Sequence, residues 1–361
     1  MNNSADYEQQ LRVKETRLKH LLSPVYEGRL DVFRSPESYY RMRAEFRIWH
    51  EGDDTFHIMF DQKSKQKYRV DQLPAACHLI NEAMKELLSL LKGNDVLRAK
   101  LFQIDYLAST NNEIVISMLY HKQLNESWEQ EARKLAHRLK CAEKIRIIGR
   151  AKKQKLIIGG DYVDETLCVN GIQYRFRQIE NSFTQPNAYI NQCMLEWTSN
   201  NIQSIGGDLL ELYCGAGNFS IPLAKNFENV LGTEISKTSV DAAQHNISVN
   251  NISNLKIARL SSEEFTQAFN QERAFYRLKD IQLEEYNFST VLVDPPRAGI
   301  DDDTLKLMSR FEHIVYISCN PETLADNLTK LNKTHRLVRV ALFDQFPLTE
   351  HIESGVILKK N

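Results

Sequence analysis

The chain has 361 residues, of which 42% are hydrophobic and 26% are charged. This composition is typical of a soluble globular protein and excludes the disordered, collagenous and membrane-spanning classes. The length fits two domains of roughly 150 residues each. The net charge of −1 argues neither for nor against a polyanionic partner.

Charge is unevenly distributed along the chain. Residues 1–180 contain 30 basic and 25 acidic side chains, whereas residues 181–361 contain 16 and 22. The excess is largest from Lys122 to Lys155, where 11 basic residues accompany four acidic ones. Two interpretations of this segment stay open: an ordinary solvated surface, or a surface that binds the phosphates of a nucleic acid.

Targeting and cysteine patterns favour a cytoplasmic protein. The N-terminus lacks the apolar segment of a secretory signal, and no run of 18 apolar residues predicts a membrane span. The six cysteines lie at least 21 positions apart without a CxxC pair. We therefore expect reduced thiols, with no disulfide framework, no metal site and no iron–sulfur cluster. No feature of the sequence requires more than a monomer.

The first half, residues 1–180, has the pattern of an α+β domain. Amphipathic spacing predicts its helices, and alternating apolar residues around turns predict its strands. The expected elements are a helix at 5–22, a hairpin at 46–60, a helix at 80–91, a hairpin at 101–120 that turns at Asn111-Asn112, and strands at 145–149, 155–158 and 172–177.

The pattern changes near residue 185, and residues 181–361 form the second predicted domain. After a helix at 187–204, short β-rich runs alternate with helical stretches such as 236–250. The seven expected strands are 209–213, 230–233, 255–260, 290–293, 314–317, 337–343 and 352–358. Strand–helix alternation indicates βαβ units and a mainly parallel sheet, whose ligands bind beyond the carboxyl ends of the strands.

A glycine turn follows the first of these strands. Gly215 and Gly217 allow the backbone to approach a ligand closely, and Glu234 ends the next strand 19 positions after Gly215, a suitable place for binding ribose hydroxyls. A lone GxG is weak evidence, and a purely structural turn stays open. Ser220 replaces the third glycine of a dinucleotide fingerprint, so S-adenosylmethionine, which has a ribose but no pyrophosphate, fits better than NAD or a flavin.

Three further residues stand at the ends of later strands. Asp294 precedes two prolines that fix a rigid turn, Cys319 follows the next strand, and Glu353 opens the last one. Taken singly, each has a structural interpretation: a turn residue, a core thiol and a solvated carboxylate. Their shared position at the carboxyl edge places them in one crevice and favours a functional role.

Several segments together resemble the RNA uracil-C5 methyltransferases, a class I, S-adenosylmethionine-dependent family. The resemblance lies in FTQPN at 183–187, LYCGAGNFS at 212–220, VDPPRAG at 293–299, ISCNPETL at 317–324 and HIESG at 351–355. Segments 40–50, 101–106 and 119–122 further resemble the bacterial tRNA (uracil-5-)-methyltransferases, so the similarity covers the full length. The chain lacks the additional length and the four-cysteine site of some ribosomal-RNA relatives.

The resemblance implies a Rossmann-like methyltransferase domain, an RNA-binding N-terminal domain and a role for each site residue. Cys319 matches the nucleophile that adds to C6 of uracil, and Glu353 matches the base that removes the C5 proton. The positions that match cofactor-binding residues are Gln185, Tyr213, Asn218, Glu234 and Asp294. The sequence has DPPR where cytosine-C5 enzymes have a second cysteine, which disfavours cytosine as the target.

The resemblance also implies a substrate, uridine 54 in the T-loop of the tRNA T-arm, together with the similar loop of tmRNA. That base must leave its stack before it can react. Phe102 and Tyr106 could stack on exposed bases, although core packing is the commoner role of an aromatic residue. Two alternatives stay open: a ribosomal-RNA uracil methyltransferase, and an RNA chaperone that folds tRNA and for which methylation is secondary.

Overall fold

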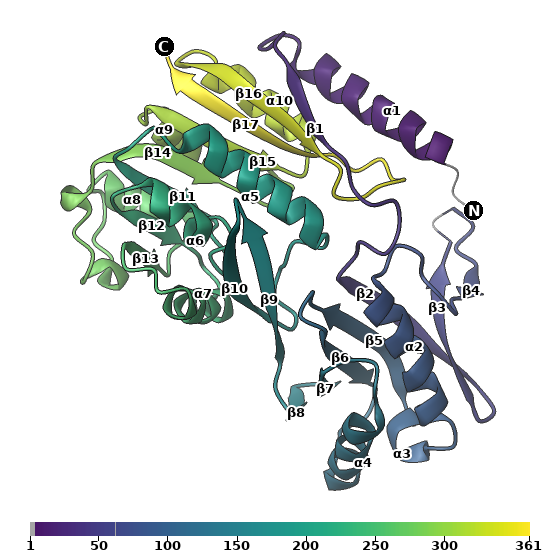
Figure 1. Cartoon of the computed structure of the whole chain (residues 1–361). Helices are drawn as coiled ribbons and strands as arrows, with labels where there is room; N and C mark the ends of the chain where they lie inside the picture. Colours follow the sequence, from purple (N-terminus) through teal and green to yellow (C-terminus); the bar gives the residue numbers. More distant parts are fainter. Residues whose placement is uncertain (1–3, 62) are drawn as a thin grey trace. The chain divides into compact units, whose positions relative to one another are not determined.

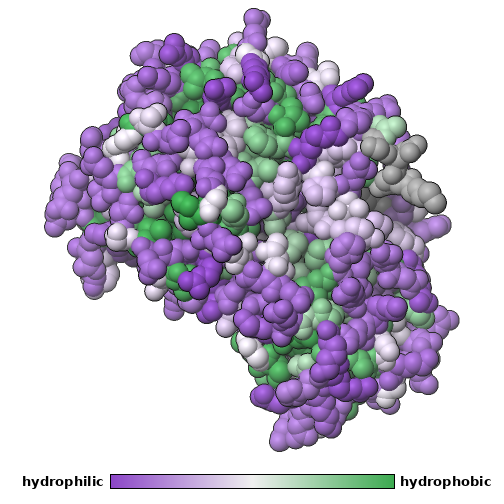
Figure 2. All heavy atoms as spheres, viewed as in Figure 1, coloured by the Kyte–Doolittle hydropathy of each residue, from purple (hydrophilic) through white to green (hydrophobic). Residues whose placement is uncertain are grey.

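A computed structural model describes residues 4–61 and 63–361. The chain forms two compact units. The parallel-sheet unit comprises residues 1–37, 167–176 and 189–361, and the mixed-sheet unit comprises residues 38–166 and 177–188. The face of the molecule shown in Figure 2 is mostly hydrophilic, with smaller apolar areas between the polar ones.

The parallel-sheet unit is built on an eight-stranded sheet of order β1-β16-β17-β15-β14-β11-β12-β13 (Figure 1). All neighbouring pairs are parallel except the two that involve β17, which lies antiparallel between β16 and β15. The strands are β1 (Leu30–Phe33), β11 (Asp208–Leu212), β12 (Val230–Thr233), β13 (Leu255–Ala258), β14 (Phe288–Val293), β15 (His313–Ser318), β16 (His335–Phe343) and β17 (Glu353–Lys360).

Helices flank this sheet because each connection between parallel strands must cross over it. They are α1 (Ser4–Leu22), α5 (Ala188–Ile202), α6 (Ser220–Leu223), α7 (Lys237–Val249), α8 (Ser262–Phe269), α9 (Asp302–Met308) and α10 (Pro321–Leu331), with short 3-10 turns at Ala224–Asn226, Tyr276–Leu278 and Leu283–Glu285. One hydrophobic core joins buried residues of α1, α8, α9 and α10 to alternate strand residues such as Leu210, Val291 and Ile314.

The mixed-sheet unit contains a seven-stranded sheet of order β4-β3-β2-β5-β6-β7-β8, antiparallel except for the parallel pair β6 and β7. Its elements are β2 (Arg43–Glu51), β3 (Asp54–Phe60), β4 (Lys67–Arg69), α2 (His78–Leu91), α3 (Asp95–Arg98), β5 (Leu101–Ala108), β6 (Glu113–Tyr120), α4 (Glu126–Arg138), β7 (Lys144–Ala151) and β8 (Gln154–Ile158). Helix α4 supplies the crossover between the two parallel strands. The basic segment therefore spans a helix and a hairpin.

A two-stranded hairpin of β9 (Tyr162–Val169) and β10 (Ile172–Ile179) contributes residues to both units. Its turn is Asn170-Gly171, and both residues have positive φ, of 51° and 78°. This dipeptide is the one that tight hairpins prefer. Strand β9 and helix α4 are two elements that the sequence analysis did not predict.

The structure confirms the predicted α/β class and all seven predicted strands of the parallel-sheet unit, and it adds an eighth. Strand β1 extends the sheet beyond β16, with Leu30 opposite Val340 and Phe33 opposite Phe343. Residues 1–37 consequently belong to the same compact unit as residues 189–361, so the units differ from the predicted division at residue 180. Four residues with one charge, Asp31, carry too little periodicity to identify an edge strand.

Candidate active site

The glycine turn after β11 depends on positive φ angles. Tyr213, Gly215 and Gly217 have φ of 62°, 55° and 85°. Residues other than glycine rarely adopt positive φ. A Cβ on Gly217 would also lie 2.9 Å from a side-chain carbon of Ile221. The sequence therefore folds here into a tight turn at the carboxyl end of β11.

Glu234 closes one side of this turn. It follows the last residue of β12, and its carboxylate accepts hydrogen bonds from the backbone N–H of Gly215 at 3.1 Å and of Ser236 at 2.7 Å. Each carboxylate oxygen can accept a second hydrogen bond. Gly215 and Glu234, 19 positions apart in the sequence, are thus in direct contact at the ends of two neighbouring strands.

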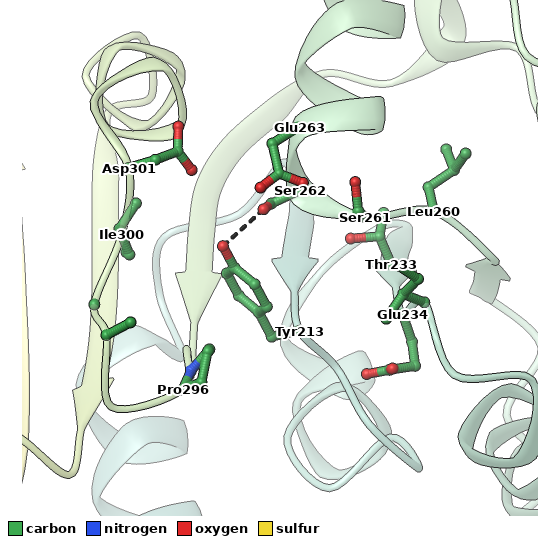
Figure 3. Close-up of a pocket in the computed structure, with 13 residues that line it drawn as sticks. Tyr213, Thr233, Glu234, Leu260, Ser261, Ser262, Glu263, Pro296, Ile300 and Asp301 are labelled. Atoms are coloured by element: carbon green, nitrogen blue, oxygen red, sulfur yellow. Dashed lines mark hydrogen bonds between the residues drawn. The ribbon is translucent and has the colours of Figure 1, made fainter.

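A pocket of about 400 Å³ opens beside Tyr213 (Figure 3). Figure 3 shows the Tyr213 ring between the start of α8 and the loop that carries Pro296 and Asp301, with the Tyr213 hydroxyl 2.7 Å from Ser262 Oγ. The lining residues are Tyr213, Thr233, Glu234, Ile235, Leu260, Ser261, Ser262, Glu263, Pro296, Ala298, Gly299, Ile300 and Asp301. Apolar walls for a purine ring and a carboxylate for ribose hydroxyls fit an adenosyl group.

Three predicted cofactor residues, Gln185, Asn218 and Asp294, lie outside this lining. Asn218 exchanges two hydrogen bonds of 2.9 Å with Asn191 on α5, which fixes its side chain at the start of α6. Gln185 belongs to the segment 177–188 of the mixed-sheet unit. The structure thus places Tyr213 and Glu234 together at one pocket, and Asn218 on the adjoining turn.

Cys319 and Glu353 are brought together by strand register. Ser318 at the end of β15 pairs with Ser354 of β17, so the antiparallel register sets Cys319 beside Glu353. The Ser354 hydroxyl donates to the Ser318 carbonyl at 3.3 Å, which ties the two strands at this point. Glu353 is buried and Cys319 is partly exposed.

Asp294 completes the cluster from β14, the neighbour of β15. Desolvation raises its pKa to about 7. Burial also raises the pKa of Glu353, and the charge of Asp294 raises it further. Two carboxyl groups that share a desolvated site cannot both ionise easily, so the pair retains a proton near neutral pH.

Arg297 is a member of this cluster to which the sequence analysis gave no role. Burial, Glu353 and Asp294 raise the pKa of the Cys319 thiol, whereas the Arg297 charge lowers it. Arg297 acts on Glu353 in the same sense. Its place in the VDPPRAG segment, three residues after Asp294, was the available signal, because a strand-end turn aims nearby side chains at the same crevice.

Glu211 is a second residue that the sequence did not identify. It is buried within β11, accepts a hydrogen bond from Ser220, and has a pKa raised to about 8 by burial, with smaller contributions from Asp294 and Glu234. A lone glutamate inside an apolar strand was the signal. It adds a neutral acid beneath the glycine turn.

The paired carboxylates of the mixed-sheet unit partly neutralise the basic segment. Arg146 and Lys144 bind Glu113, Arg150 binds Glu180, and Lys155 lies 2.6 Å from Asp161. Lys152 and Lys153, in the turn between β7 and β8, are exposed and form no ion pair within residues 4–61 and 63–361. Arg138 and Lys140 are likewise exposed and form no ion pair in those ranges, so internal neutralisation leaves these four side chains of the segment available for phosphates.

A family model described as tRNA (uracil-5-)-methyltransferase matches residues 6–361. The chain belongs to this family. It is therefore an S-adenosylmethionine-dependent enzyme of the uracil-C5 class, as the sequence resemblance implied. The chain is 59% identical over 358 residues to the tRNA/tmRNA (uracil-C(5))-methyltransferase of Pseudoalteromonas atlantica, covering 99% of this chain and 98% of the relative. For the Haemophilus influenzae enzyme of the same name the identity is 57% over 355 residues, with 98% of each chain covered.

The family fold is also seen in a solved structure. The crystal structure of Pyrococcus abyssi tRNA (uracil-54, C5)-methyltransferase in complex with S-adenosyl-L-homocysteine matches with a TM-score of 0.73 and 23% identity, over 98% of this chain and 83% of the other. Within residues 4–61 and 63–361 no group of three or more His, Cys, Asp or Glu side chains could hold a metal. In the same ranges, no helix has both the length and the apolar character of a membrane span.

Proposed function

We propose that the protein transfers a methyl group from S-adenosylmethionine to C5 of uridine 54 in the T-loop of tRNA, and to the corresponding uridine of tmRNA. The observation that carries this proposal is the strand register that sets Cys319 beside Glu353, at the same sheet edge as Asp294 and the Tyr213 pocket. Relatives at 57–59% identity carry the tRNA/tmRNA name, which supports the choice of RNA.

The cofactor, when bound, supplies an electrophilic methyl group on a sulfonium. In this proposal Glu234 accepts the ribose hydroxyls and Tyr213 packs beside the adenosyl group, while Asp294 and Asn218 lie toward its methionine end. Apolar contacts and a few fixed polar groups are the usual composition of such a pocket.

The first chemical step activates the base. The Cys319 thiolate adds to C6 of uracil, and the electron pair of the C5–C6 bond moves onto the ring carbonyl to form an enolate. C5 is then nucleophilic and displaces the sulfonium, so that a C5–methyl bond forms as the sulfur–methyl bond breaks. Arg297 favours the thiolate, because its positive charge offsets part of the rise in the Cys319 pKa that burial, Glu353 and Asp294 cause.

The second step regenerates the enzyme. The ionised Glu353 carboxylate takes the proton from C5, the released pair forms the C5–C6 double bond, and the bond from C6 to sulfur breaks. Cys319 leaves as thiolate and 5-methyluridine is free to dissociate. Glu353 retains the proton until solvent removes it. Proton, methyl group and sulfur are thereby all accounted for.

The RNA itself is assigned to the residues of the predicted RNA-binding domain, 1–180. The exposed pair Lys152 and Lys153 supplies charge for phosphates. We further propose a cytoplasmic monomer, because its RNA substrates reside in that compartment and one chain carries every residue that the two steps need.

Nucleoside mass spectrometry tests the activity directly. Unmodified tRNA incubated with the protein and S-adenosylmethionine is expected to gain 5-methyluridine, and a uridine-54 to cytidine transcript is expected to gain none. Absence of 5-methyluridine would overturn the proposal. T-arm RNA that carries 5-fluorouridine tests the mechanism, since fluorine cannot leave as a proton does and the covalent complex persists. Cys319→Ala should form no such complex.

A further inference from the structure

Helix α1 buries one stripe of side chains, and that stripe contains a single charge. Tyr7, Leu11, Leu18 and Leu22 are each at most 3% exposed, as expected for positions spaced three or four apart. Lys14 occupies the position between Leu11 and Leu18 and is 2% exposed. A buried ammonium is costly unless it is paired, so its partner identifies its role.

The partner of Lys14 lies 330 residues away along the chain. Its ammonium donates to Asp344 Oδ1 at 2.7 Å and to the backbone carbonyl of Phe346 at 2.8 Å. Asp344 is fully buried and directly follows β16. The ion pair therefore fixes the first residues of the segment that connects β16 to β17.

Two other side chains on α1 hold the later part of the same segment. Gln10 donates to the carbonyl of Thr349 at 2.5 Å and accepts from the N–H of Leu348 at 3.2 Å. Arg17 donates to the carbonyl of Glu350 at 3.3 Å. Gln10, Lys14 and Arg17 are four and three residues apart, so they lie on one face of the helix.

The held segment, residues 344–352, leads directly into Glu353, the first residue of β17. Its last turn also meets the cluster from the other side, where His351 Nδ1 lies 3.4 Å from a guanidinium nitrogen of Arg297. Glu353 itself pairs with Phe343, the residue before Asp344. Both ends of the segment are thus tied to fixed elements, and α1 fixes its middle.

We propose that Lys14 is a positioning residue for the methyl-transfer reaction: through Asp344 and Phe346 it holds the 344–352 segment so that Glu353 reaches the C5 proton of the methylated base. Gln10 assists from the same helix face. The inference rests on the proposed function, in which Glu353 is the base. It assigns α1 a part in proton removal, because a small displacement of a catalytic group costs large factors in rate.

The test separates proton removal from the steps before it. With T-arm RNA that carries uridine, Lys14→Met is expected to turn over about tenfold or more slowly and to accumulate the methylated covalent complex on denaturing gels, as is also expected for Glu353→Gln. With 5-fluorouridine RNA the same variant should form its complex at a rate within about twofold of the parent, because that reaction stops before proton removal. Lys19→Met, on the same helix but exposed, is the matched control.

Gln10→Ala keeps the test independent of folding, since it removes two hydrogen bonds at a half-buried position and leaves the ion pair intact. It should slow turnover on uridine RNA by about threefold with the fluorouridine reaction unchanged. Parental turnover in both variants would overturn the inference. So would an equal fall in turnover and in fluorouridine complex formation, which is the sign of a merely structural role. If the parent forms no fluorouridine complex, the proposed function fails instead.

Discussion

The paired carboxylates of the mixed-sheet unit and the Asp294–Glu353 cluster of the parallel-sheet unit differ in their partners. In the mixed-sheet unit Glu113 lies 2.6 Å from Lys144 and 2.8 Å from Arg146, and these bonds lower its pKa. Glu180 is similarly held by Arg150 and Ser117, and its pKa is also lowered. In the parallel-sheet unit Asp294 and Glu353 share a desolvated site and their pKa values rise, whereas the buried Asp344 is paired with Lys14.

The difference separates groups that hold the fold from groups available for chemistry. A paired carboxylate has a lowered pKa and is therefore a weak base, so it accepts a proton from a substrate poorly at neutral pH. Asp294 and Glu353 share a desolvated edge with one nearby guanidinium, that of Arg297. Glu165 of the mixed-sheet unit is an exception: Thr110 and the Thr166 N–H bind it, yet burial raises its pKa to about 7. A raised pKa alone therefore does not mark a catalytic site.

The largest effect is expected for Glu353→Gln. The amide cannot remove the C5 proton, so turnover should fall by about 10³-fold, a typical contribution of general base catalysis. Steady-state methylation of T-arm RNA measures the loss, and Glu353→Asp should recover part of it. If Glu353→Gln retains more than about a tenth of parental turnover, a residue other than Glu353 is the base.

Glu113→Gln tests the ion-paired carboxylates of the mixed-sheet unit. It leaves Arg146 buried without its counter-charge and should lower the free energy of unfolding by about 3 kcal/mol, as expected for a broken buried pair. Urea unfolding gives this value. Turnover per folded molecule should be unchanged. A fall in turnover without a change in stability would reverse the roles given to the two classes.

The pH dependence of turnover should follow the raised pKa values of Asp294 and Glu353. As the pH falls through about 7 the Asp294–Glu353 pair takes up a further proton and its base form is lost, so kcat/KM should rise as pH increases through about 7. The slope should approach tenfold per pH unit on the acid side. A profile on T-arm RNA from pH 5.5 to 9 measures it. An acid limb near pH 4, the ordinary range of a carboxyl, would contradict the shared proton.

The smallest effect concerns salt. If Lys152 and Lys153 bind phosphates, replacing both with Gln should reduce the slope of log affinity against log salt by roughly 1.5, whereas Lys155→Gln should change it little because Lys155 pairs with Asp161 and Glu180. Filter binding of T-arm RNA at several salt concentrations gives both slopes. Equal slopes for the double variant and the parent would make the turn a solvated surface.

Sequence reasoning reached most of the candidate site because parallel strands end at one edge. Once the strands that precede Tyr213, Glu234, Asp294 and Cys319 are recognised, their proximity follows from topology alone. The role of Glu353 needed the resemblance to a family. The antiparallel register that sets it beside Cys319 is visible only in the structure.

The parts that sequence could not reach depend on distant pairs. Lys14 and Asp344 are separated by 330 residues, and neither position alone predicts its partner. The ion pair of Glu113 with Arg146 likewise neutralises part of the basic segment from Lys122 to Lys155, which the sequence alone does not reveal. Local patterns describe elements, whereas these contacts are made between elements after they pack. The compact units differ from the predicted domains for the same reason, because β1 pairs with β16.

The position of β17 has a consequence for the order of folding. It lies between β15 and β16, so β16 and β1 pair with the rest of the sheet only through it. The strands that form the Tyr213 pocket, β11 to β14, can associate before it inserts. Pairings between strands far apart in the sequence form late, because the entropy cost of closing the intervening loop comes before the favourable contacts are made. A molecule arrested at that stage would have the cofactor pocket but would lack Glu353, the proposed base, at the sheet edge. Catalytic activity would then depend on the insertion of β17.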